Sequence, residues 1–415
     1  MKIELREEKF VMGLYFVSFL CLLLTVMDNV PLLGVLMRVR YLYILCVAFF
    51  CIKDRIIIWN RRLFVVFGLL VIHTLLYCLV FINPTIKLYT QQLFESLIIT
   101  YVFAFFTLIY IYKHSCYMDF LVLTTLALSI MIVWASVTHI NNFVNPIYYL
   151  NVFSRYERYR APFGMGDVNF CGNYALYTLI MLIITVKEWL NRGNKLSGFW
   201  IVCICFVSLL TVCMLFYTAS RSALLSLAIF IVLCLIQKYW ELIRPRLKIL
   251  FPVLLVGGLL VLAVFIGSGK FAQIWTDSNR EGNFSINYPI YQAYGDYLNG
   301  MGYADNSGYL QKIYGYDTTA QDVYYLYIWF STGYLGAALI FGQMIYMLYL
   351  ILRYRKTVGW KWTVSLFALM LFYCIWQVNY MNARYFTGII HMIILFYFVL
   401  NINEGKDTKW IILKK

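Results

Sequence analysis

The stretch with the clearest chemical potential is 217–227, which reads Tyr-Thr-Ala-Ser-Arg-Ser-Ala-Leu-Leu-Ser-Leu and joins two long apolar runs. A fixed positive charge where two membrane helices meet is costly unless it lies at a wet surface or faces a charged partner. The planar guanidinium group of arginine binds phosphate oxygens through paired hydrogen bonds and stays charged in every protein environment. We therefore predict that Arg221 holds an anionic group of a lipid-linked substrate.

Further arginines fall in the segments that we expect on the same side of the membrane as Arg221. Their alternative role is structural, because they could pair with nearby acids such as Glu157 and Asp277 or reach toward lipid headgroups, and surface pairs of that kind contribute little. Arg221 has no acid near it in the sequence, so the functional interpretation is favoured most strongly there. The other candidates for anion binding are Arg155, Arg158, Arg160, Arg280 and Arg384.

Two other residue types could contact a sugar. Tyr288, Tyr291, Tyr294 and Tyr297 recur at every third position, which predicts one side of a short helix. A tyrosine offers a flat apolar face and a hydroxyl to a sugar ring, although an aromatic belt at the membrane interface explains the same residues equally well. Asp322 opens a long apolar run, where an acid is by default a helix cap and could otherwise serve as a general base.

Metal and cofactor chemistry find no support in the sequence. The cysteines lie mostly inside apolar runs and never form Cys-x-x-Cys, and the four histidines form no cluster. A His-Glu-x-x-His motif, a P-loop and a dinucleotide-binding glycine motif are all missing from the sequence. We expect no metal site, no disulfide framework and no cofactor.

The composition indicates a membrane protein. Of the 415 residues 63% are hydrophobic and only 13% charged, too few charges to keep the surface of a soluble protein of this size wet. A formal net charge of +15 would suggest a nucleic-acid partner in a soluble protein. In a membrane protein the positive-inside rule explains it better, so we expect no nucleic acid.

The apolar runs predict an all-α integral membrane protein in which 1–415 form a single polytopic domain. About 20 apolar residues cross the hydrocarbon core, so about twelve helices are expected. The predicted spans are 10–27, 31–52, 63–83, 93–112, 119–138, 169–187, 198–217, 222–237, 249–267, 321–350, 362–380 and 384–402.

The distribution of lysine and arginine predicts the orientation. If the N-terminus is cytoplasmic, alternation of the spans places the basic segments 53–62, 187–195 and 238–248 in the cytoplasm, together with 353–361 and 404–415. Two long loops then face the other side, 139–168 and 268–320. Loops of such length are usually functional or disordered, and the aromatic content of the second argues for structure.

Four pieces of the sequence are informative together: Thr218-Ala-Ser-Arg-Ser-Ala-Leu-Leu225, the loop with Arg280 and Gly300-Met-Gly302, the helix from Leu326 to Gly336, and Arg160-Ala-Pro-Phe-Gly164 with Asn169. In their order along the chain and on one membrane side, they resemble the O-antigen ligase and polysaccharide polymerase family of bacterial inner-membrane proteins. They cover roughly residues 155–340, about half of the chain.

The resemblance implies a GT-C-like glycosyltransferase with undecaprenyl-pyrophosphate-linked glycans as donor and acceptor. Such enzymes act at the periplasmic face of the inner membrane, invert the anomeric centre and need no metal. Arg221 and Arg280 would hold the pyrophosphate. From its position alone, apart from the resemblance, Asp322 is the candidate base. Membrane lipid and a chain-length regulator protein are further candidate partners. Substrate-binding roles would fall to Arg158, Arg160, Asn169, Arg384, Tyr288, Tyr291 and Tyr324.

One departure from the family pattern separates two activities. Ligases typically carry a histidine before the third similar segment, and here that place is taken by Asp322. The departure favours a polymerase of repeat units over a ligase that transfers finished polymer to lipid A–core. A transporter or flippase for lipid-linked sugars is the alternative from another class, and it would place charges near the bilayer midplane and break its helices.

Overall fold

The structure is a computed structural model of the chain. It describes residues 2–28, 33–54, 58–79, 87–145, 159–166, 168–239, 288–289, 291–292, 297–300, 323–354, 361–375, 386–402 and 408–410.

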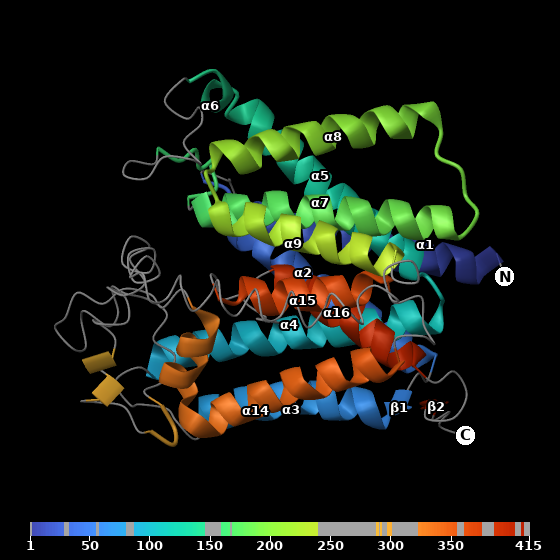
Figure 1. The fold of residues 1–415 in the computed structure, drawn as a ribbon. Coiled ribbons are helices and arrows are strands. Elements are labelled where there is room, and N and C mark those ends of the chain that lie inside the picture. Colours follow the sequence, from blue (N-terminus) through green and yellow to red (C-terminus); the bar gives the residue numbers. More distant parts are fainter. Residues whose placement is uncertain are drawn as a thin grey trace. The chain divides into compact units, whose positions relative to one another are not determined.

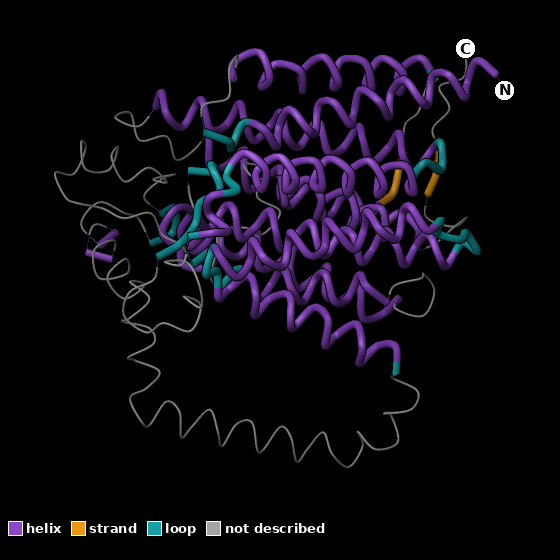
Figure 2. The backbone as a smooth tube through the Cα atoms, turned by 90° about the horizontal axis from the view of Figure 1, so that it is seen from above, coloured by secondary structure: helices purple, strands orange, loops and turns teal. Residues whose placement is uncertain are grey.

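The described residues are mostly helical (Figure 2). Each predicted span coincides with a helix, except 249–267, which lies outside the described residues. The helices are α1 (Lys2–Leu24), α2 (Leu33–Lys53), α3 (Arg61–Leu79), α4 (Lys87–Lys113), α5 (Tyr117–Thr138), α6 (Asn141–Val144), α7 (Val168–Asn191), α8 (Gly198–Tyr217), α9 (Arg221–Lys238), α14 (Tyr324–Tyr354), α15 (Lys361–Tyr373) and α16 (Phe386–Asn401).

Five of the described helices, α5, α7, α8, α9 and α14, are long and apolar enough to cross a membrane. Their length and composition are those of a multi-pass, α-helical membrane protein. The total of about twelve spans and the GT-C-like arrangement stay predictions.

A short strand pair joins two segments that are far apart in the chain. β1 (Ile58–Asn60) pairs antiparallel with β2 (Thr408–Trp410), with Ile58 opposite Trp410. The sequence did not predict it, because both strands lie outside the apolar runs and are too short for a period-of-two pattern to be seen.

The chain divides into two compact units, which are described separately. Unit 1 comprises 1–61, 98–228 and 383–415, and unit 2 comprises 62–97 and 229–382.

In unit 1, α1 packs on α2 and α5, and α7 packs on α5 and α8. Aromatic side chains fill the space between the first helices: Tyr15 lies 5.6 Å from Phe120 and 5.8 Å from Tyr43 between ring centroids. Both tyrosine hydroxyls are buried and hydrogen-bonded to threonines, Tyr15 to Thr124 and Tyr43 to Thr107, each at 2.8 Å. These bonds matter because a lipid-embedded polar group without a partner costs several kcal/mol, on the order of 2–7.

Helix α16 is the most enclosed of these elements, with almost its whole length buried. The Tyr177 hydroxyl of α7 hydrogen-bonds Nε2 of His391 at 2.7 Å, and the Tyr397 ring stacks on Tyr117 at 4.0 Å. His391, to which the sequence assigns no role, is thus a hydrogen-bonded core residue that joins α16 to α7.

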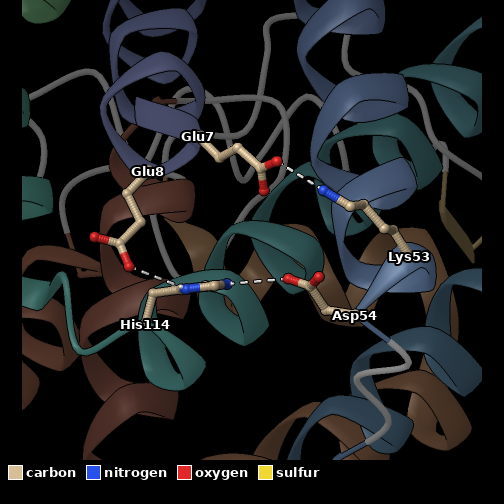
Figure 3. A network of polar contacts seen from close by, with 5 residues as sticks. All are labelled: Glu7, Glu8, Lys53, Asp54 and His114. Atoms are coloured by element: carbon tan, nitrogen blue, oxygen red, sulfur yellow. Dashed lines mark hydrogen bonds and ion pairs between the residues drawn. The ribbon is translucent and has the colours of Figure 1, made fainter. Parts of the chain in front are cut away.

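A polar network ties the first helices together at one end of unit 1 (Figure 3). The Lys53 ammonium contacts the Glu7 carboxylate at 2.7 Å. The His114 ring lies between two acids, with Nδ1 3.2 Å from Glu8 and Nε2 3.5 Å from Asp54. The hydrogen bond that Lys53 donates to Glu7 raises the pKa of Lys53. This end, which also carries the α7–α8 connection, is called the N-terminal end below; the turn between α8 and α9 lies at the opposite end, near α6 (Figure 1).

In unit 2, helix α14 packs on α15 and is interrupted at Gly333, which has φ 61° and ψ −163°. Residues 297–300 fit into the interruption. The Tyr334 and Leu335 N–H groups donate to the carbonyls of Tyr297 and Leu298 at 2.9 and 3.1 Å. A Cβ on Gly333 would lie 2.5 Å from the Leu298 carbonyl, and a Cβ on Gly300 would lie 2.5 Å from the Ser331 carbonyl. Two of the segments that carried the family resemblance therefore fit together through their glycines.

The contact predicts opposite effects for two alanine substitutions in α14. Gly333→Ala forces a residue with a Cβ into a left-handed conformation and into the backbone of Leu298, and should destabilise the protein by roughly 2 kcal/mol or more. Gly342→Ala meets no atom within 4 Å and should be neutral or stabilising by up to ~1 kcal/mol. Thermal unfolding of the purified protein in detergent measures both changes. Equal midpoints of thermal unfolding for the two variants would contradict the close packing of Gly333 against residues 297–300.

Candidate functional site

The site is built on the turn that reverses the chain between α8 and α9. Helix α8 ends at Tyr217, three residues turn the chain, and α9 begins at Arg221. Ala219 in the turn has φ 49°, a conformation that side-chain-bearing residues seldom adopt. Strain of this kind persists only where the surroundings hold it in place, and it is often found at functional sites.

Small residues are required where this turn packs against α7. Ser220 is buried, and it packs directly on Gly172 of α7, where an added Cβ would lie 2.6 Å from the Ser220 hydroxyl oxygen. The Thr218-Ala-Ser sequence thus lets α7 approach the turn closely. This close contact fixes the position of Arg221, the first residue of α9.

A guanidinium group fastens the turn to the preceding loop. Arg160 donates from Nε to the Thr218 carbonyl at 3.0 Å and from Nη2 to the Asn169 side-chain oxygen at 2.9 Å. The next residue adds a backbone bond, from the Ala161 N–H to the Tyr217 carbonyl at 3.1 Å. Arg160 therefore joins the loop, the start of α7 and the turn. The planar guanidinium group fixes the directions of these hydrogen bonds.

The loop that carries Arg160 is held from two further elements. The Asp28 N–H donates to the Gly164 carbonyl at 2.6 Å, and the Asp28 carboxylate accepts from the Gly166 N–H at 3.2 Å. Gly164 has φ 72°, and any side chain there would overlap the ring of His139 at the end of α5. The residues following α1 and α5 thus both support residues 160–166.

An aromatic cluster packs next to the turn. The Phe143 ring of α6 is 4.9 Å from Phe163 and 5.2 Å from Tyr217, and the Tyr217 hydroxyl donates to the Phe143 carbonyl at 3.0 Å. Arg221 itself is exposed. The first turn of an α-helix presents N–H groups and a partial positive charge, so the start of α9 adds to the electropositive character of this surface.

The structure brings together three of the residues predicted from the sequence: Arg160, Asn169 and Arg221 meet around the 217–221 turn. Of these, Arg160 bonds both Asn169 and the turn, a positioning arrangement that the sequence did not anticipate. The remaining charged candidates lie outside the described residues: Arg155, Arg158, Arg280, Asp322 and Arg384.

The aromatic candidates belong to unit 2 and differ in exposure. Tyr291 is buried, with its ring 5.2 Å from Phe330, and Tyr324 is a buried residue of α14. Tyr297 is 50% exposed and Tyr334 is 57% exposed, and their rings are nearly parallel, with planes 16° apart and centroids separated by 6.5 Å.

The described tyrosines of the second loop therefore divide in two. Tyr288 and Tyr291 lie in short helical pieces next to α14, with Tyr288 6.5 Å from Trp329, and Tyr294 lies outside the described residues. Among the described residues, Tyr297 and Tyr334 form an exposed aromatic pair.

Asp28 and His139 contact the site loop, yet sequence reasoning missed both. Each is the first polar residue after a predicted span on the same membrane side as Arg221, and that position is the signal that could have found them. The ends of these two spans lie close together only in the folded chain, where Asp28 and His139 contact residues 160–166.

Metal and thiol chemistry are not indicated for the part of the chain that the structure describes. No group of three or more His, Cys, Asp or Glu side chains among the described residues is arranged to hold an ion. The described cysteines are free, and burial raises the pKa of the Cys116 thiol to about 12, which keeps it protonated at neutral pH.

No protein-family model and no curated protein matches the chain. The residues around the 217–221 turn are therefore the basis on which a function can be proposed.

The Arg160 contacts predict a specific loss of stability. Arg160→Ala removes two hydrogen bonds from a charged donor, and because the group is half-exposed we expect a cost of about 1–2 kcal/mol, with Arg160→Lys between wild type and alanine. Arg192→Ala, at an exposed position of the α7–α8 connection, should change stability by less than ~0.5 kcal/mol. Thermal unfolding in detergent is the measurement. A lysine variant as stable as wild type would show that the planar geometry is not needed.

Proposed function

We propose that this chain is a polymerase of oligosaccharide repeat units carried on undecaprenyl pyrophosphate, for O-antigen or a similar surface polysaccharide. It would act at the periplasmic face of the bacterial inner membrane, with both termini in the cytoplasm. Donor and acceptor are both lipid-linked glycans, so the site must lie at a helix end near the headgroup level. The 217–221 turn joins the ends of two helices that are long and apolar enough to cross a membrane.

One observation carries the proposal. The sequence predicts Arg160 and Arg221 as anion-binding residues in two separate segments. The hydrogen bonds of Arg160 to Thr218 and Asn169 join these segments. The turn that presents Arg221 is thus short and is held by hydrogen bonds from the preceding loop and by packing against α7. A pyrophosphate site needs such a fixed cation, because preorganised charge stabilises a transition state without the cost of reorganisation.

The proposed reaction is an inverting displacement. A sugar hydroxyl of one lipid-linked unit attacks C1 of the reducing-end sugar on the growing chain. As the new C1–O bond forms, the bond from C1 to the pyrophosphate oxygen breaks and its electron pair leaves with undecaprenyl pyrophosphate. The hydroxyl proton passes to a base, for which Asp322 is the proposed residue.

Arg221 has the main electrostatic role in this scheme. Pyrophosphate is already a good leaving group, so the protein needs chiefly to neutralise the charge that develops on it. A guanidinium group beside a low-dielectric wall, aided by the N–H groups at the start of α9, contributes a few kcal/mol by analogy with other charge-stabilising donors, on the order of 3–4. Arg280 is the proposed second cation, and Arg158 and Arg384 are proposed to contact the same substrate.

The interruption of α14 is the observation that most favours the alternative of a transporter. Transporters use the free backbone groups of broken helices to hold substrate. Here the Tyr334 and Leu335 N–H groups at the break donate to the carbonyls of Tyr297 and Leu298. Because those two donors are used within the chain, the break serves to dock residues 297–300, and the enzyme remains the better proposal.

The first test is the chain length of the polysaccharide made by a deletion strain complemented with variants. Arg221→Ala should abolish long chains while single-repeat product remains, and Arg221→Lys should retain partial activity because charge is kept and paired bonding is lost. Lys238→Ala changes an exposed cation at the other end of the same helix and should leave chain length unchanged. Wild-type chain length in the Arg221→Ala strain, at equal protein level, would exclude the role given to Arg221.

The second test separates the candidate activities. Loss of the polysaccharide ladder with one repeat retained on the core identifies a polymerase, whereas loss of every repeat identifies the ligase alternative. Purified protein incubated with lipid-linked repeat units in detergent should join them, with release of undecaprenyl pyrophosphate. If no product longer than one repeat forms while lipid-linked units are carried across vesicles, the protein is a transporter.

A further inference from the structure

A cavity of about 260 Å³ lies between α5, α7 and α8 in unit 1, away from the 217–221 turn. Its lining comes from the second half of α7, the first half of α8 and the connection between them, together with one face of α5. For comparison, an engineered apolar cavity of about 150 Å³ stays dry and binds benzene. Space of this size is thus sufficient for part of an apolar ligand.

The polar groups in the cavity wall are engaged with one another or with the backbone. The Thr125 hydroxyl bonds the Thr185 hydroxyl at 2.7 Å and the Leu121 carbonyl at 2.7 Å, and the Ser129 hydroxyl donates to the Thr125 carbonyl at 2.7 Å. A water in a cavity needs two to four polar partners. Since these hydroxyls already have partners, the cavity favours an apolar occupant over water.

The cavity opens onto the outer surface of unit 1. Two apolar lining residues are well exposed, Leu126 at 38% and Trp200 at 54%. The adjoining surface of α8 exposes large apolar side chains, including Phe199, Val202 and Phe206. Because α8 is long and apolar enough to span a membrane, the opening lies where lipid chains surround the protein.

One end of the cavity has a different chemistry. Lys195, in the α7–α8 connection, is exposed and lines the cavity together with Trp189 and Trp200, and the Trp189 indole N–H donates to the Lys195 carbonyl at 3.4 Å. Tryptophans mark the headgroup level of a membrane, and a lysine there attracts acidic headgroups. The cavity is therefore apolar along its length and cationic at its mouth.

We propose that this cavity binds one acyl chain of an anionic phospholipid, with the headgroup phosphate beside Lys195. The apolar walls match the chain, the indoles match the interface, and the ammonium gives preference for a negatively charged headgroup. The site lies toward the N-terminal end of unit 1, on the leaflet opposite the 217–221 turn. It is a phospholipid site distinct from the proposed substrate site and does not depend on the proposed activity.

The test measures lipids retained by the purified full-length protein in native mass spectrometry, after addition of phosphatidylglycerol or phosphatidylcholine. Wild type should retain phosphatidylglycerol preferentially. Lys195→Gln should reduce that preference about fivefold, as expected for one lysine near an acidic headgroup. Ser129→Phe should fill the cavity and lower retention of both lipids at least about tenfold by removing the space for the chain.

A matched control is Val202→Phe, which adds an aromatic ring to an exposed position of α8 outside the cavity lining and should leave retention unchanged. Lys195→Gln alters an exposed side chain, so its result stands even if Ser129→Phe lowers the thermal midpoint. Equal retention of the two lipids by wild type would overturn the proposal. Selective retention of undecaprenyl phosphate would also overturn it, as would unchanged lipid retention in Ser129→Phe.

Discussion

The interaction on which the site depends is the contact of the Arg160 guanidinium with the Thr218 carbonyl and the Asn169 side chain. It supplies a donor to a carbonyl at the end of α8, where helices leave several backbone acceptors without intrahelical partners. The same group ties the loop before α7 to that end. The Arg160 cation thus holds the turn between α8 and α9, and its hydrogen bonds offset the cost of its partial burial. Arg221 begins α9 directly after this turn.

Three other long-range polar contacts in unit 1 share one pattern. In each, a tyrosine hydroxyl of one helix bonds a threonine or histidine of another: Tyr15 with Thr124, Tyr43 with Thr107 and Tyr177 with His391. Each pair satisfies groups that lipid cannot hydrogen-bond, and each specifies which helix faces which, whereas apolar packing alone selects partners less strictly in a membrane.

Much of the helical framework was predictable because a membrane requires long apolar runs, and runs such as 119–138 and 198–217 coincide with α5 and α8. Arg160 and Arg221 could be selected because arginines at the span ends of this membrane side are few, and Asn169 was selected through the family resemblance. The supporting roles of Asp28 and His139 could not be predicted, since they arise from helix ends that meet in space. The same holds for the fit of Gly333 to residues 297–300, which depends on backbone geometry that no side-chain pattern reveals.

The enclosure of α16 bears on how the chain assembles during synthesis. This helix, residues 386–401, is buried along almost its whole length and contacts α7 and the start of α5, and the nearby strand 408–410 pairs with 58–60. Helices α5 and α7 are synthesised long before α16 leaves the ribosome. Until then the faces of α5 and α7 that contact α16, with Tyr177 among them, must be shielded by lipid or by the insertion machinery, so a stalled nascent chain exposes these faces to quality-control proteases.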